Sequence, residues 1–265
     1  MDNSITNTLP NEILAYVASF LVHDKKAQCA FAGVCNLFCY VAHDVFDQRP
    51  VFQYVCRCGY ADVVKLFLAD GRVDPAADDN YAIQSSSTNG HADVVKLLLE
   101  DGRADPTTFD NYAIQWSSEN GHTDVVQLLL ADARVNPAAD GSNALLFSSE
   151  NGHTDVVKLL LEDGRADPTA CYNRAIRLSC DKGHTDVVKL LLEDGRANPI
   201  ACYNYAIQLS CDKGHTDVVK LLLADGRADP TADHNYAIRR SRAFGHTDVV
   251  KLLIADGRAD PTYFT

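Results

Sequence analysis

The stretch that decides the fold is GHTDVVKLLLEDGRADPTACYNRAIRLSCDK, residues 152–182. Closely similar versions of this stretch recur every 31 residues along most of the chain. Seven prolines mark the period, each 31 positions after the one before: Pro75, Pro106, Pro137, Pro168, Pro199, Pro230 and Pro261. Seven such units account for the chain from about residue 49 onward, so the sequence predicts a repeat protein.

Each unit predicts two helices and a turn, and the second helix has the clearer pattern. In one copy, Val125, Val126 and the three leucines after Gln127 form a wide apolar stripe at helical spacing. Thr123 is a suitable N-cap for this helix, and Asp124 suits the positive end of its dipole. Glycines stand where a left-handed C-terminal cap is expected: Gly102, Gly164, Gly195 and Gly226.

One unit, residues 121–151, departs from the others at its predicted cap. Ala133 replaces the capping glycine, and GSNALLF replaces the stretch built on NYAIQ elsewhere. An alanine in a left-handed cap costs on the order of 1 kcal/mol. The sequence therefore predicts locally weaker structure in this unit.

The first helix of each unit is short and runs through sequences such as YAIQWSSEN, with Asn111 or Asn204 as a predicted cap. Small residues recur on one side of it, which lets neighbouring helices approach closely: Ala113 and Ser117, Ala144 and Ser148, Ala175 and Ser179, Ala206 and Ser210. No single unit can bury its apolar stripe alone. We therefore expect the units to stack into one all-α solenoid.

This pattern resembles the ankyrin repeat. The residues in common in one copy are Gly183, His184, Val187, Val188, Leu190, Leu191, Leu192, Gly195 and Ala197. The resemblance covers roughly four-fifths of the chain and implies an ankyrin-like helical solenoid of seven 31-residue repeats. The unit is shorter than the family's usual length of about 33 residues, and Tyr-Ala-Ile-Gln or Tyr-Ala-Ile-Arg replaces its Thr-Pro-Leu-His. These departures concern the turn rather than the pairing of helices.

Residues 8–46 do not share the period and predict three helices with apolar faces. They resemble an F-box through Leu9-Pro10-x-Glu12-Ile13-Leu14, Ser19-Phe20-Leu21, Asp24, and Val34-Cys35 followed by Phe38. A departure lies at residues 25–28, where Lys-Lys-Ala-Gln replaces the family's leucine-rich run.

The F-box resemblance implies that residues 1–48 dock onto a Skp-type adaptor of a cullin–RING ubiquitin ligase, while the ankyrin repeat array of residues 49–265 holds the target. The implied adaptor contacts are Leu9, Pro10, Ile13, Leu14, Phe20, Leu21, Val34 and Phe38. The alternative is a non-ligase ankyrin scaffold whose N-terminal helices only cap the array, because a solenoid needs a terminal cap.

The composition restricts the partners and the compartment. A formal net charge of −12 repels phosphate backbones, so we expect no nucleic-acid partner. The apolar stretches are far shorter than the roughly 20 residues that span a bilayer, and the N-terminus does not have the form of a secretory signal. We therefore expect no membrane partner and a cytoplasmic or nuclear protein. F-box and ankyrin modules also occur together in proteins of large viruses, and the compartment is then the host cell's.

The sequence gives little support for a metal site, a disulfide or a catalytic site. Six histidines recur one repeat apart: His91, His122, His153, His184, His215 and His246. Stacked helices lie about 8–10 Å apart, whereas zinc needs nitrogens at about 2 Å, so we expect these histidines to hydrogen-bond turn backbone. Cysteines in neighbouring repeats are too far apart for disulfides and are expected to be thiols. No phosphate loop or catalytic triad can be singled out, so the sequence predicts no enzyme, no catalytic residue, no metal and no cofactor.

Positions that differ between repeats predict where a target binds. In ankyrin-like stacks the turns and first helices line the concave face, and aromatic and arginine side chains are typical anchors there. The candidate target-binding residues are Phe109, Trp116, Phe147, Tyr172, Tyr203, His234, Arg239 and Arg240. For Trp116 and Phe147, packing between repeats is an equal alternative. The net charge rises from −4 for residues 90–120 to +1 for residues 214–244, which predicts an acidic proximal half and a more basic distal end.

Overall fold

The computed structural model describes residues 48–259. The predicted F-box-like helices and all eight implied adaptor contacts (Leu9, Pro10, Ile13, Leu14, Phe20, Leu21, Val34 and Phe38) lie outside the described residues. Within residues 48–259 there are fourteen α-helices and no strand, which confirms the all-α fold class.

Seven pairs of helices follow one another in this part of the chain. The first helices of the pairs are α4 (Gln48–Cys58), α6 (Ala77–Thr88), α8 (Thr108–Glu119), α10 (Ala139–Asn151), α12 (Ala170–Lys182), α14 (Ala201–Lys213) and α16 (Ala232–Ala243). The second helices are α5 (Ala61–Asp70), α7 (Ala92–Asp101), α9 (Thr123–Ala131), α11 (Thr154–Asp163), α13 (Thr185–Asp194), α15 (Thr216–Asp225) and α17 (Thr247–Asp256).

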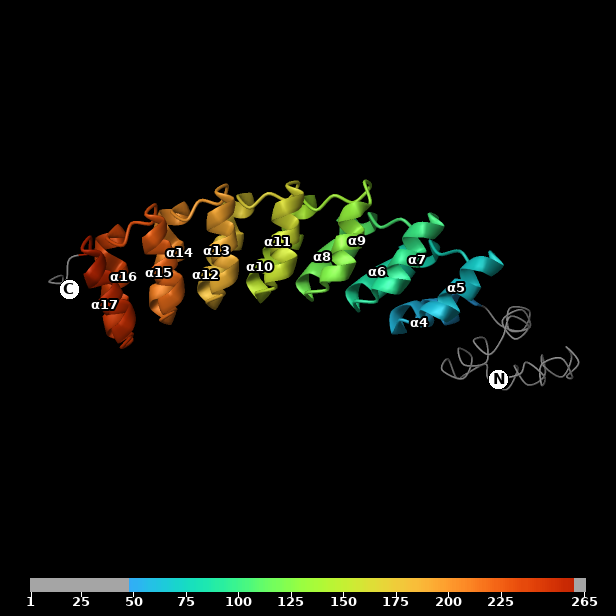
Figure 1. Cartoon of the computed structure of the whole chain (residues 1–265), viewed down its shortest axis with the longest axis horizontal. Helices are drawn as coiled ribbons and strands as arrows, with labels where there is room; N and C mark the ends of the chain where they lie inside the picture. Colours follow the sequence, from blue (N-terminus) through green and yellow to red (C-terminus); the bar gives the residue numbers. More distant parts are fainter. Residues whose placement is uncertain (1–47, 260–265) are drawn as a thin grey trace, which may run out of the picture. The chain divides into compact units, whose positions relative to one another are not determined.

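Figure 1 labels the helices in chain order, and by their contacts they belong to two compact units. Among the described residues, unit 1 comprises residues 48–117 and Gln127–Val135, and unit 2 comprises Ser118–Val126 and residues 136–259. In unit 1, α4 packs on α5 and α6, and α5 packs on α7. In unit 2, α10, α12, α14 and α16 pack in succession, and so do α11, α13, α15 and α17. Each unit therefore has a layer of first helices and a layer of second helices, as expected of a helical solenoid.

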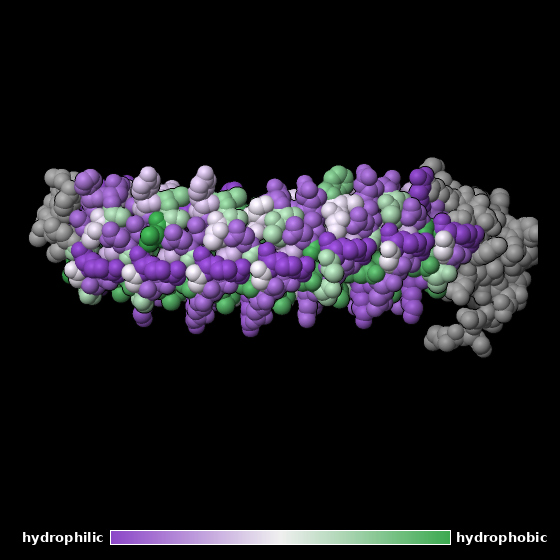
Figure 2. All heavy atoms as spheres, turned by 90° about the horizontal axis from the view of Figure 1, so that it is seen from above, coloured by the Kyte–Doolittle hydropathy of each residue, from purple (hydrophilic) through white to green (hydrophobic). Residues whose placement is uncertain are grey.

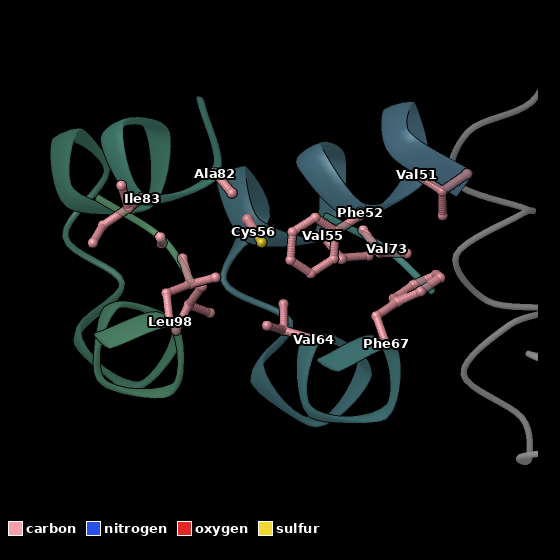
Figure 3. Packing of buried hydrophobic residues seen from close by; sticks show 12 residues of the cluster. Val51, Phe52, Val55, Cys56, Val64, Phe67, Val73, Ala82, Ile83 and Leu98 are labelled. Carbon is pink, nitrogen blue, oxygen red and sulfur yellow. The ribbon is translucent and has the colours of Figure 1, made fainter. Parts of the chain in front are cut away.

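The apolar stripe of the second helices forms the core between the layers. In unit 1, Val55 of α4 lies with Val64 and Phe67 of α5, and Leu98 of α7 lies below Ile83 of α6 (Figure 3). All five side chains are almost completely buried. The ring centroids of Phe67 and Phe52 lie 5.9 Å apart, edge to face. Burial of these side chains across neighbouring helices is the main favourable term in such an array.

The same stripe recurs in unit 2. Fully buried side chains recur on its second helices: Val156, Val157 and Leu160, Val187, Val188 and Leu191, Val218, Val219 and Leu222, and Val249 and Leu253. In the copy used for the prediction, Val125, Val126 and Leu129 are buried, whereas Leu128 and Leu130 are half-buried. The small residues predicted for the first helices are buried as well, from Ala113 to Ser210. The predicted inward faces of both helices are thus confirmed.

The predicted C-terminal caps are confirmed at the glycines and wrong at the alanine. Gly102, Gly164, Gly195 and Gly226 each end a second helix in the left-handed conformation, with φ from 77° to 80°. Ala133 does not adopt a positive φ. Since α9 already ends at Ala131, Ala133 does not occupy the cap position. The strain expected at Ala133 is therefore absent.

The predicted N-caps are wrong in both helices of the repeat. The second helix begins after a histidine such as His184, whose side chain makes no capping hydrogen bond. Thr185, the next residue, lies inside the helix, and its hydroxyl donates a hydrogen bond to the carbonyl of Gly183 at 3.4 Å. The asparagine expected to cap the first helix serves a different purpose, because the chain enters that helix through a left-handed turn.

Candidate protein-binding surface

Three consecutive residues in the left-handed conformation precede the right-handed part of each first helix from α6 to α16. In α12, Cys171, Tyr172 and Asn173 have φ of 50°, 60° and 58°. The N–H of Asn173 donates to the carbonyl of Thr169 at 2.9 Å, which closes the turn. We call these segments the left-handed turns: residues 78–80, 109–111, 140–142, 171–173, 202–204 and 233–235. Only one of these residues, Gly141, is a glycine, and a left-handed conformation costs other residues roughly 1–2 kcal/mol each.

The last residue of the turn ties it to the next repeat. The side-chain oxygens of Asn80 and Asn204 accept hydrogen bonds from the backbone N–H groups of Asp105 and Asp229, at 2.7 and 2.8 Å. Ser142 does the same for Asp167 at 2.9 Å. These asparagines therefore link neighbouring repeats instead of capping a helix. The links offset part of the cost of the turn and fix the direction of its other side chains.

Three aromatic candidates of the turns project into solvent. Tyr172 is 81% exposed, Tyr203 is 89% exposed and Phe109 is 63% exposed. His234, at the equivalent place in the last described turn, is exposed as well. The face of the molecule drawn in Figure 2 is mostly hydrophilic, with apolar residues in small separate patches. Tyr172 and Tyr203, on the left-handed turns of the neighbouring helices α12 and α14, are therefore exposed aromatic candidates for contact with a partner.

The candidates on the first helices are less exposed. Trp116 is 37% exposed and its ring lies 5.3 Å from that of Tyr112, centroid to centroid. Phe147 is half-buried. Both side chains are partly buried and partly accessible, so target contact and packing both stay predictions for them.

The two arginine candidates of α16 already have partners inside the protein. The Nε of Arg240 lies 2.8 Å from Asp212 on α14, and its guanidinium lies 4.4 Å from the ring centroid of Phe244. Asp212 also raises the pKa of Arg240, chiefly through this hydrogen bond. Arg239 donates to the carbonyl of Asp233 at 3.4 Å. Both are half-buried, so a partner can reach only part of each side chain.

The histidines hold the repeats together, as the sequence predicts. The Nε2 atoms of His153, His184 and His215 each lie 2.8 Å from a backbone carbonyl of the preceding repeat. Because a carbonyl only accepts, Nε2 carries the proton. The ring packs against the glycine one repeat earlier, where an added Cβ on Gly183 would lie 2.6 Å from Nδ1 of His215. Among the described residues, no three histidine, cysteine, aspartate or glutamate side chains are grouped so as to hold a metal ion.

A further link between repeats comes from the arginine of the turn after each second helix. Arg103 forms an ion pair with Asp101 at 2.7 Å and donates to the carbonyl of Val73, one repeat earlier, at 3.0 Å. Arg227 repeats this arrangement with Asp225 and Ala197. Hydrogen bonds from these arginines are the main reason that the pKa of Asp101 and that of Asp225 lie below the ordinary value. The period of the arginines pointed to this link, but sequence reasoning assigned them only to a turn.

The described cysteines are free thiols: Cys56, Cys58, Cys171, Cys180, Cys202 and Cys211. Burial raises the pKa of Cys180 and that of Cys211 to about 12, so both stay protonated and act as core residues. Cys171 and Cys202 are exposed on left-handed turns.

Charge is distributed unevenly over the first helices. In unit 1, α6 carries Asp78 and Asp79 and no cation. In unit 2, α12 carries three cations against one acid, and α16 carries three arginines against one acid. From α6 onward the first helices pass from acidic (α6, α8 and α10) to basic (α12 and α16), as the sequence predicts. The first of them, α4, departs from this trend, because it carries Arg49 and Arg57 and no acid.

The comparisons with known proteins agree with this architecture. The family model described as "Ankyrin repeats (3 copies)" matches residues 103–171 and 176–264, and the model described as "Ankyrin repeat" matches residues 81–111. No curated protein matches the chain. None of the helices within residues 48–259 combines the length and apolar character needed to cross a membrane.

Proposed function

The chain belongs to the ankyrin-repeat family, and from this premise we propose that its left-handed turns and first helices hold a target protein. Ankyrin repeats bind proteins and are typically not enzymes, so the chain is a protein-binding scaffold. The observation that supports the proposed surface best is the exposure of Tyr172 and Tyr203 on neighbouring turns. Large aromatic side chains so exposed are favoured as anchors at interfaces.

Affinity purification of the full chain from cells tests the surface. The double variant Tyr172→Ser/Tyr203→Ser should lose its captured proteins, because it removes both rings while leaving the buried links between repeats intact. The matched control is Lys158→Ser/Lys189→Ser, which changes two exposed side chains on the second helices α11 and α13. Equal capture by both variants and the unaltered chain would refute the proposed surface.

We further propose that residues 1–48 are an F-box-like domain, which makes the chain a substrate receptor of an SCF-type cullin–RING ubiquitin ligase. The support is the run Leu9-Pro10-x-Glu12-Ile13-Leu14 with Phe20-Leu21 and the later Val34 and Phe38. On this proposal, residues 49–265 present the target while the N-terminal domain binds a Skp-type adaptor.

Binding of the full chain to purified Skp adaptor tests the ligase role. The intact chain should bind, Leu9→Ala/Pro10→Ala should not, and Tyr172→Ser/Tyr203→Ser should bind as well as the intact chain. If the intact chain does not bind the adaptor, the alternative holds: a non-ligase scaffold whose N-terminal helices only cap the repeats.

A further inference from the structure

A hollow of about 240 Å³ lies between the first helices α12 and α14 of unit 2. Its lining residues are Arg174, Arg177, Leu178, Asp181, Tyr205 and Leu209. It opens on the same layer of first helices that carries Tyr172 and Tyr203. The hollow therefore lies where the proposed target would sit.

The two arginines distinguish α12 from its neighbour. The sequences ACYNRAIRLSCDK of α12 and ACYNYAIQLSCDK of α14 differ at only two of thirteen positions. At both positions α12 has arginine, Arg174 and Arg177, and both arginines line the hollow. The fold does not require arginine there, because α14 forms an equivalent helix with Tyr205 and Gln208.

Neither arginine has a carboxylate partner among the described residues, unlike most arginines of unit 2. Arg196, Arg227 and Arg240 form ion pairs at 2.7 to 2.9 Å. Arg177 makes a single hydrogen bond within the described part of the chain, from Nη2 to the carbonyl of Cys171 at 3.3 Å. Its Nε is buried without a hydrogen-bond partner. A guanidinium has five N–H donors, so Arg177 has donors left for a ligand.

The next pair of first helices shows why a hollow forms between α12 and α14. Between α14 and α16, Arg240 lies over the ring of Tyr236, 5.7 Å from its centroid, and pairs with Asp212. One repeat earlier, Leu209 stands in the place of Arg240, while Tyr205 and Asp181 stand in the places of Tyr236 and Asp212. The shorter leucine leaves the space that Arg240 fills.

The chemistry of the lining selects the occupant. Two arginines outweigh Asp181, so the hollow carries a net positive charge in a chain whose total is −12. Leu178, Leu209 and the ring of Tyr205 supply apolar walls. Arginine forks match carboxylates with paired hydrogen bonds, and the apolar walls suit an aliphatic neighbour. A nucleic-acid strand fits poorly, because its phosphates would meet the acidic remainder of the chain.

We propose that this hollow recognises an acidic side chain, glutamate or aspartate, next to an aliphatic residue in a segment of the target protein. The proposal rests on the proposed function and names the chemistry of its partner. Arg174 and Arg177 bind the carboxylate, and Leu178 and Leu209 contact the aliphatic neighbour.

Fluorescence anisotropy with the full chain tests this recognition. The probe is a labelled peptide with Glu-Leu-Glu-Val between Gly-Ser spacers, and the controls carry Gln or Lys in place of Glu. We expect saturable binding of the Glu peptide only. The variant Arg174→Tyr/Arg177→Gln, which gives α12 the sequence of α14, should weaken that binding by about tenfold or more.

The variant is expected to fold, because Gln208 already donates to the carbonyl of Tyr203 at 3.0 Å at the equivalent position of α14. The matched control Lys158→Gln/Lys189→Gln removes two cations from the second helices and should bind the Glu peptide normally. The proposal is overturned if the Glu peptide does not bind at about 1 mM, if the Gln or Lys peptide binds as well, or if the arginine variant binds unchanged. A 12-nucleotide oligothymidylate that displaces the Glu peptide also overturns it.

This outcome is separate from that of the proposed function. If the peptide test fails but Tyr172→Ser/Tyr203→Ser still loses its captured proteins, the surface binds a target without an acidic anchor in this hollow. If the capture test fails while the peptide binds, the hollow is real and the aromatic surface is not the target site.

Discussion

The two helices of a repeat differ in how freely their sequences vary. In unit 2, the second helices α11 and α13 have the same ten residues, TDVVKLLLED. The first helices α10 and α12 share only three of thirteen residues, and two of these are the buried alanine and serine, Ala144 and Ser148 in α10. Between these two repeats the second helix is unchanged, whereas the first helix keeps its buried small residues and varies at most other positions.

The largest effect should come from emptying the shared core. Leu191 of α13 is completely buried, and Leu191→Ala should lower the free energy of unfolding by about 3 kcal/mol, since it removes apolar contacts and leaves a cavity. Tyr203→Ala on the variable side should change it by less than about 0.5 kcal/mol. Urea unfolding of both variants measures the contrast, and similar losses would mean that the two sides are equally constrained.

A smaller effect should separate two glycines with the same backbone conformation. Gly183 and Gly195 both have φ of 78°, but an added Cβ meets His215 at Gly183 and nothing within 4 Å at Gly195. Gly195→Ala should cost about 1 kcal/mol for the left-handed conformation alone. Gly183→Ala should cost about 2 kcal/mol or more, because the ring of His215 must also move.

Equal unfolding midpoints for the two glycine variants would show that the histidine ring does not depend on the glycine. The histidine links would then matter less to the stack than their geometry suggests.

The smallest effect should appear on acidification. Arginine hydrogen bonds lower the pKa of five aspartates at or just after the ends of second helices: Asp101, Asp132, Asp163, Asp225 and Asp256. Each pair therefore contributes stability that is present above the ordinary aspartate pKa of 3.8 and is lost as the pH falls below it. The loss per pair should be modest, because the arginines are partly exposed.

Urea midpoints at about pH 7 and about pH 3 measure this acid effect. Arg227→Gln should be less stable at pH 7 and should show a smaller decrease on acidification. A decrease as large as that of the intact chain would assign the acid sensitivity to other carboxylates.

Much of the fold was readable from the sequence, because its signals are local and repeated. The apolar stripe of the second helix, the glycine caps and the backbone role of the histidines followed from residue type and spacing. The caps at Thr123 and Asn204 and the strain at Ala133 were predicted wrongly. Those predictions assumed that each residue acts within its own helix, whereas Asn204 bonds to Asp229 of the next repeat and α9 ends early.

The candidate site was only partly readable. Residue type singled out Tyr172 and Tyr203, but it could not show that Arg240 is already paired with Asp212 or that Arg174 and Arg177 are not. Those facts depend on which side chains meet across neighbouring repeats. The sequence shows which residues occupy equivalent positions in successive repeats. It does not show which of their side chains are in contact.

The central claim is that the left-handed turns and first helices bind the target, whereas the second helices do not. Hydrogen exchange of the full chain, free and bound to a captured target, tests this claim most directly. The account predicts that added protection falls on the left-handed turns and first helices α12 and α14, with no change in α13. Added protection confined to α13 and the other second helices would contradict it.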